Sequence, residues 1–181
     1  MKNPDRNHPD FKGKEKMLIF FDTEFTELGI DPRLISIGLV SEDGSREFYA
    51  ELSDTYRDED CSDFVHEAVL PHLEGGAARM TMGELTLRLG NWIEGFEQPV
   101  KLATDSLSWD WPWVGEIFHT PCTRPENLHP YPASLDEITN PDIFEQIEQI
   151  FEREPDLRRH HALDDAKVNR LGWIWDRQQD Y

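Results

Sequence analysis

The sequence predicts an α/β fold with a mixed sheet, in which an antiparallel three-stranded meander is joined by parallel strands and flanked by helices. Residues 17–25, 34–40 and 47–52 are apolar or alternating runs of strand length, separated by short polar segments. Residues 99–104 form a short, bounded apolar run between two helical patterns, which is typical of a buried parallel strand. These observations place the chain in the α/β class.

The meander is supported by its turn chemistry. Asp43-Gly44 lies between the second and third runs, and an Asp-Gly pair between alternating segments favours a hairpin. A helix is expected over 60–70, ending before Pro71. Thr81 and Glu84 have capping-box spacing and open a helix over 81–96. One face of that helix carries Leu85, Leu89, Trp92 and Ile93.

The second half of the chain predicts three more helices around an irregular connection. A helix over 111–118 would hold Pro112 in its first turn, where proline is tolerated. Residues 122–139 are rich in proline and predict an irregular or extended crossover. Helices are expected over 142–152 and 163–178.

Length favours a single domain, because 181 residues suffice for one core. Residues 17–181 are assigned to that domain and the polar segment 1–16 to a flexible leader. The sequence shows no signal-peptide pattern and no apolar run of membrane-spanning length. Two cysteines far apart suit a reducing interior, so a cytoplasmic location without membrane association is expected.

The charge balance limits the mode of nucleic-acid binding. The formal net charge is −19, from 37 acidic and 18 basic residues. Such a balance argues against a protein that coats a duplex by neutralising phosphates. It remains compatible with an enzyme that holds one short end through a few contacts and bound cations.

Two acids lie one residue apart at the end of the first strand. Asp22 and Glu24 would face the same side, because side chains alternate along a strand. Two carboxylates this close repel unless a cation lies between them, and oxygen ligands favour Mg²⁺ or Mn²⁺. The alternative is that Glu24 only faces solvent at the strand end.

Further acids follow two later segments. Asp105 comes at the carboxyl end of strand 99–104, where α/β sheets place their sites, and Asp110 comes shortly afterwards. One of them could instead cap the next helix. His160 and His161 precede the last helix, and Asp165 lies in its first turn, where the helix dipole also favours acids.

Together these motifs resemble the DEDDh 3′–5′ exonuclease superfamily, whose fold is ribonuclease-H-like. The resemblance rests on FDTEFTEL with the meander that follows it, on an acid after a middle strand, and on HHALDDA at the final helix, and it spans residues 19–170. Members include polymerase proofreading subunits, RNase T and oligoribonucleases. The stretch after the first motif also resembles the RNase AS-like exoribonucleases.

The resemblance implies a catalytic set. The first motif supplies Asp22 and Glu24, and the third supplies His160 and Asp165, which leaves His161 and Asp164 at variable positions. The second motif supplies Asp110, with Asp105 as the rival in a place where the family often has asparagine. Asp22, Glu24, Asp110 and Asp165 would hold two Mg²⁺ or Mn²⁺ ions, and His160 would be the general base.

The resemblance also implies substrate contacts and a partner. Thr26 would contact the terminal 3′-hydroxyl, and Phe25 with Leu28 would wedge against terminal bases. Arg158 and Arg159 directly precede His160, so at least one of them, with Arg159 chosen, would reach the site mouth. The expected substrate is the 3′ end of a single strand, RNA rather than DNA. A proofreading-type exodeoxyribonuclease and a non-catalytic binding module are the alternatives. A two-fold homodimer is expected, with basic residues of one subunit facing the other's metal site.

Overall fold

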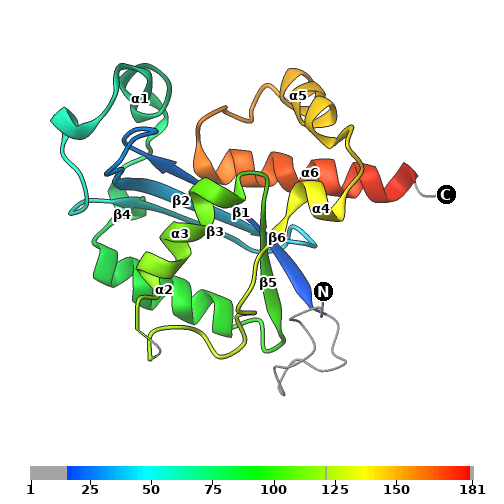
Figure 1. Ribbon diagram of the computed structural model, residues 1–181, viewed down its shortest axis with the longest axis horizontal. Coiled ribbons are helices and arrows are strands. Elements are labelled where there is room, and N and C mark those ends of the chain that lie inside the picture. Colours follow the sequence, from blue (N-terminus) through cyan, green and yellow to red (C-terminus); the bar gives the residue numbers. More distant parts are fainter. Residues whose placement is uncertain (1–15, 121, 180–181) are drawn as a thin grey trace.

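The computed structural model describes residues 16–120 and 122–179, so the predicted leader lies outside the described residues except for Lys16. A six-stranded sheet forms the centre of the chain, in the order β4-β3-β2-β1-β5-β6 (Figure 1). Its strands are β1 (Met17–Phe25), β2 (Leu34–Ser41), β3 (Glu47–Leu52), β4 (Arg79–Met80), β5 (Val100–Thr104) and β6 (Ala133–Ser134).

The predicted strand pairing is confirmed. β1, β2 and β3 pair antiparallel in sequence order, and β5 lies parallel to β1 on its other side. The short strands β4 and β6 add parallel pairs at the two edges. The sequence did not predict them, because two residues are too few to show an alternating pattern.

Helices cover both faces of the sheet. α2 (Met82–Glu94) and α3 (Leu107–Ile117) pack on one face, and α5 (Ile143–Arg153) and α6 (Ala162–Gln179) cover the other. The sheet is thereby sandwiched between two apolar layers. Figure 1 shows α6 running along the sheet, with α5 above it on the same side as α1.

Alternation along β1 decides where its acids point. Ile19 and Phe21 belong to the core formed with α2 and α3, whereas Phe20 belongs to the core formed with α5 and α6. Asp22 and Glu24 continue the register of Phe20, so they project from the α6 face at the carboxyl end of the strand. Asp22 and Glu24 therefore share one face of the sheet, as inferred from the sequence.

Two helix predictions need correction. α3 begins at Leu107 rather than at 111, so Pro112 lies beyond the first turn of the helix. The earlier start arises because the backbone N–H groups of Trp109 and Asp110 both donate to the carbonyl of Ser106. Proline is favoured in the first turn of a helix, which is why the start was expected next to Pro112. That expectation fails here because a helical turn already forms upstream of the proline.

The helix expected over 60–70 is divided into short pieces. Residues Asp58–Asp60 and Leu70–His72 are 3₁₀ turns on either side of α1 (Asp63–Ala68). Ser62 caps α1 by accepting the N–H of Val65, which starts the helix later than predicted. The 122–139 crossover contains β6 and ends in the one-turn helix α4 (Leu135–Ile138), but is otherwise irregular as expected. Across 16–120 and 122–179, none of the helices has both the length and the apolar composition needed to cross a membrane.

Candidate active site

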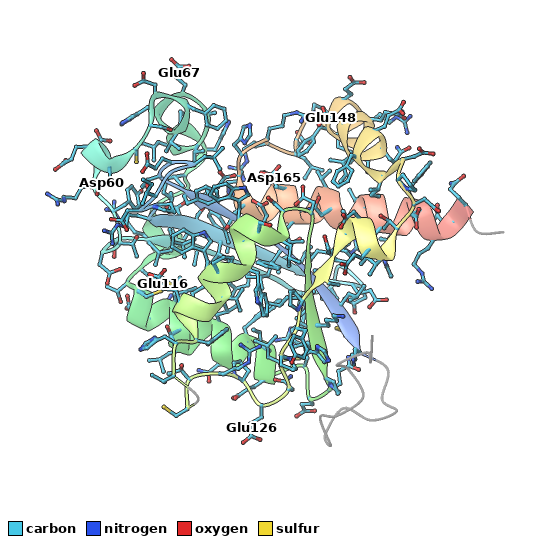
Figure 2. All side chains as sticks on the ribbon, viewed as in Figure 1. Asp60, Glu67, Glu116, Glu126, Glu148 and Asp165 are labelled. Atoms are coloured by element: carbon cyan, nitrogen blue, oxygen red, sulfur yellow. The ribbon has the colours of Figure 1, made fainter. Side chains whose placement is uncertain are left out.

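A cleft of about 620 Å³ opens at the carboxyl ends of β1 and β5. Its walls come from β1, the start of α3, the segment before α6, and the helices α1 and α5. In Figure 2, Asp165 lies at the start of α6, between α1 on one side and α5, marked by Glu148, on the other. Seven acids line this cleft, and five of them cluster at its floor: Asp22, Glu24, Asp105, Asp110 and Asp165.

A glycine in β2 lets α6 approach the acids of β1. Gly38 pairs with Asp22 across the sheet, and a Cβ atom at Gly38 would lie 2.2 Å from the backbone nitrogen of Leu163. The first turn of α6 therefore rests directly on the backbone of β2. This close packing brings Asp165 over the end of β1, where a larger residue at position 38 would hold it away.

The carboxylates form two groups that share Asp22. Oxygen atoms of Asp22, Glu24 and Asp165 lie within 4.8 Å of one another, and so do those of Asp22, Asp105 and Asp110. Opposite ligands of an octahedral Mg²⁺ are about 4.2 Å apart, so either group can surround one ion. Because every donor is a carboxylate oxygen, the set fits Mg²⁺ or Mn²⁺. The residues therefore fit hard divalent cations, and Asp22 belongs to both groups.

Without cations, the clustered acids raise one another's pKa. Burial, followed by the charges of Asp165 and Asp110, raises the pKa of Glu24 to about 9. Burial and the charge of Asp105 raise the pKa of Asp165 to about 8, although the backbone N–H groups of His160 and His161 act in the opposite direction. Burial and four neighbouring acids raise the pKa of Asp22 well above its ordinary range. Such shifts are typical of sites that bind cations or perform catalysis.

Asp110 is a buried acid of the cleft wall, not the N-cap of α3. Asp110 is 1% exposed. One of its carboxylate oxygens accepts a hydrogen bond from the hydroxyl of Thr23 at 2.5 Å, and the other accepts one from the hydroxyl of Thr104. Burial raises the pKa of Asp110 to about 7, while the two threonine hydroxyls oppose the rise. Ser106 is the residue that precedes α3, which excludes the capping role considered for Asp110.

His160 lies at the mouth of the cleft, in a strained backbone conformation. Its φ of 60° is in the left-handed region, which non-glycine residues adopt at a cost. The ring meets Phe64 of α1 edge-on, with the centroids 4.9 Å apart. Burial, and then the charge of Arg159, lowers the pKa of His160 below its ordinary 6.5, so the ring is neutral at pH 7. A neutral imidazole at this position can accept a proton.

His161 and Asp164 are outside the cleft, as the motif spacing predicts. The side chain of His161 is fully buried, 3.3 Å from Asp164, and its ring meets that of Tyr49 at a tilt of 33°. Asp164 accepts a hydrogen bond from Nε of Arg158 at 2.7 Å. These residues hold the segment before α6 in place, which turns Arg158 away and leaves Arg159 beside the cleft.

Comparisons with known proteins show the family of the chain. No family model matches the chain. Two proteins named 3′–5′ exoribonuclease, from Mycobacterium tuberculosis strains CDC 1551 / Oshkosh and ATCC 25618 / H37Rv, are each 33% identical to it over 159 residues. The match covers 83% of this chain and 88% of each relative. The chain belongs to this 3′–5′ exoribonuclease family. The mixed sheet fits the ribonuclease-H-like fold predicted from the motifs.

The structure places three predicted substrate contacts of this exoribonuclease family member in the cleft and one outside it. Phe25, Leu28 and Arg159 line the cleft. Thr26 does not: it is 1% exposed, and its hydroxyl accepts the backbone N–H of Arg33 at 3.0 Å. Its backbone carbonyl accepts the N–H of Ser62. Thr26 thus holds the β1–β2 connection against the segment before α1.

Several residues of the site were not found from the sequence. Phe64 lies in α1, far from His160 in the sequence, and no periodic pattern connects the two residues. Thr23 and Thr104 look like ordinary strand residues, although they orient Asp110. Asn169 could have been found, because it lies four residues after Asp165 and therefore on the same face of a helix.

Stability without cations should fall as the pH rises. Between the pKa values of the unfolded chain, near 4, and the raised values of Asp110, Asp165 and Glu24, the folded state holds protons that the unfolded chain has released. In chelator, we expect the melting temperature to drop by about 5 °C or more from about pH 6.5 to about pH 8.5. Differential scanning calorimetry measures the drop.

Two controls accompany this measurement. Glu24→Gln removes one of the titrating groups and should make the drop smaller. Excess Mg²⁺ replaces the bound protons, so its stabilising effect should be larger at the higher pH. A melting temperature that is constant or rises with pH in chelator would contradict the prediction.

Proposed function

We propose that the protein is a DEDDh-type exoribonuclease that removes nucleotides from the 3′ end of single-stranded RNA, using two Mg²⁺ or Mn²⁺ ions and a histidine general base. The observation that carries the proposal is the pair of carboxylate groups sharing Asp22, in one cleft with His160. Membership of a family whose named relatives are 3′–5′ exoribonucleases supports RNA as the substrate.

The residues of the site have two roles, cation binding and proton transfer. When bound, two divalent cations supply charge neutralisation for the phosphodiester and lower the pKa of water. Asp22, Glu24, Asp110 and Asp165 would hold that pair in the cleft. The neutral ring of His160 accepts the proton of the attacking water. Its pKa, lowered below 6.5, keeps the base active at neutral pH.

Substrate contacts follow from the walls of the cleft. Phe25 stacks on the half-exposed Trp109, with centroids 5.7 Å apart and rings inclined by 17°, so it offers a rigid apolar wall to a terminal base. Leu28, an exposed residue, lies beside it in the cleft. Arg159 makes two hydrogen bonds to Glu148, at 3.0 and 2.8 Å, and would exchange this partner for a phosphate.

The proposal includes a two-fold homodimer. Among the described residues that line the cleft, Arg159 is the one side chain with a permanent positive charge. An RNA chain longer than a few nucleotides needs more cationic contacts than this. Basic residues of a second subunit, facing the cleft across the two-fold axis, would supply them.

A degradation ladder tests the function. RNA and DNA oligomers of one sequence, labelled at the 5′ end, should give different results: RNA shortens one nucleotide at a time, and DNA shortens more slowly. Chelator should abolish the ladder, and Mg²⁺ or Mn²⁺ should restore it. Faster shortening of DNA would instead favour the proofreading-type exodeoxyribonuclease. Binding of RNA without any cleavage in either cation would favour a non-catalytic module and reject the proposal.

A further inference from the structure

Asp105 is the fifth member of the clustered carboxylates, with no part in the mechanism above. It directly follows β5, and its side chain is half-buried at the edge of the cleft. Its Oδ1 atom accepts the side-chain amide of Asn169 at 2.8 Å. An acid is poorly placed among four others unless a cation offsets its charge, since it raises the pKa of Asp22, Asp110 and Asp165 through space.

The second carboxylate group depends on this residue. That group consists of Asp22, Asp105 and Asp110, and contains neither Glu24 nor Asp165. Without Asp105, a cation there would have two protein carboxylates, of which Asp22 is shared with the first group. Three carboxylates offer a firmer hold on a hard cation than two.

The environments of Asp105 and Asp110 give them different roles. Asp110 is 1% exposed, and both of its oxygens already accept threonine hydroxyls. Within the described part of the chain, the amide of Asn169 bonds to Oδ1 of Asp105, which leaves Oδ2 for a ligand. Asp105 is therefore the more available donor of the two.

Asn169 explains how Asp105 is oriented. It is 2% exposed and lies in α6, one turn after Asp165. Its buried amide fixes one oxygen of Asp105 from the helix that carries a ligand of the first group. Hydrogen bonds of this kind orient metal ligands and commonly change cation affinity by about 10–100-fold.

We propose that Asp105 is a direct ligand of the second cation, held in position by Asn169, so that five carboxylates rather than four bind the cation pair. This inference rests on the proposed two-cation function. It assigns the bridging ligand to Asp22, the first cation to Glu24 and Asp165, and the second to Asp105 and Asp110.

Calorimetric titration of the full chain with Mn²⁺, without RNA, tests the assignment. The wild type should bind two ions. Asp105→Asn preserves the shape of the side chain and should weaken the second binding event by about 10-fold or more while leaving the first unchanged. Glu27→Gln is the matched control: Glu27 is an exposed acid of the same cleft outside both carboxylate groups, and its loss should change neither event.

Electron paramagnetic resonance of bound Mn²⁺ gives a second readout, independent of activity. Two neighbouring ions in the wild type should give a spin-coupled spectrum, whereas Asp105→Asn at the same Mn²⁺ concentration should give the spectrum of one isolated ion. Asn169→Ala should weaken the second binding event less than Asp105→Asn does. Its melting temperature in chelator shows whether it is folded.

The outcomes separate this inference from the function on which it rests. If the wild type binds fewer than two ions, the two-cation function is rejected. If the wild type binds two ions and Asp105→Asn binds both equally well, the inference alone is overturned. A weakening by Glu27→Gln as large as that by Asp105→Asn would show a general charge effect and overturn it too.

Discussion

Asp22→Asn should reduce the turnover of RNA by at least about 10³-fold, the scale typical of removing one member of a catalytic unit. Asp22 belongs to both carboxylate groups, so its loss weakens both cation positions at once. Single-turnover cleavage of a labelled RNA oligomer at saturating Mg²⁺ measures the loss. Asp156→Asn, at an exposed position outside the cleft, is the matched control and should leave turnover unchanged.

Misfolding would not explain that loss, because the variant should be more stable in chelator. Burial and then the charges of the neighbouring acids raise the pKa of Asp22, so folding in chelator must keep this carboxyl protonated. Asparagine removes that requirement, so the melting temperature in chelator should rise. Mg²⁺ should then stabilise the variant less than the wild type. An Asp22→Asn protein with near-normal turnover would exclude Asp22 as the bridging ligand.

His160→Ala should reduce turnover by about 10²–10⁴-fold while leaving cation binding intact, as expected for the loss of a general base. The ring of His160 contacts Phe64, and only the backbone N–H of His160, which alanine keeps, bonds to Asp165. The cation positions therefore do not depend on the ring. Turnover measured together with Mn²⁺ titration checks both halves of this expectation. His119→Ala, at an exposed position outside the cleft, is the matched control.

The pH profile adds a test of the role. A general base must be neutral, so wild-type turnover should decline as the pH falls through the lowered pKa of His160, below 6.5. The residual activity of His160→Ala should lack this decline. Equal declines in both proteins would assign the titration to another group and remove His160 from the role of base.

The sequence by itself determined the strand order of the meander, the parallel strand beside it and the positions of three acidic motifs. These features depend on local rules. Side chains alternate along β1, which puts Asp22 and Glu24 on one face, and an Asp-Gly pair favours the turn before β3. The spacing from His160 to Asp165 likewise places the histidine before α6 and the acid in its first turn.

Only the tertiary structure decided how these motifs meet. Gly38 admits the first turn of α6 to the sheet, and Thr23 with Thr104 turns Asp110 into the cleft wall. Neither contact has a signature in spacing or composition. The structure also directs Thr26 toward Arg33 rather than the cleft, and it brings Asn169 to Asp105 across 64 positions of sequence. Contacts between residues so far apart depend on the packing of whole elements, which local patterns do not specify.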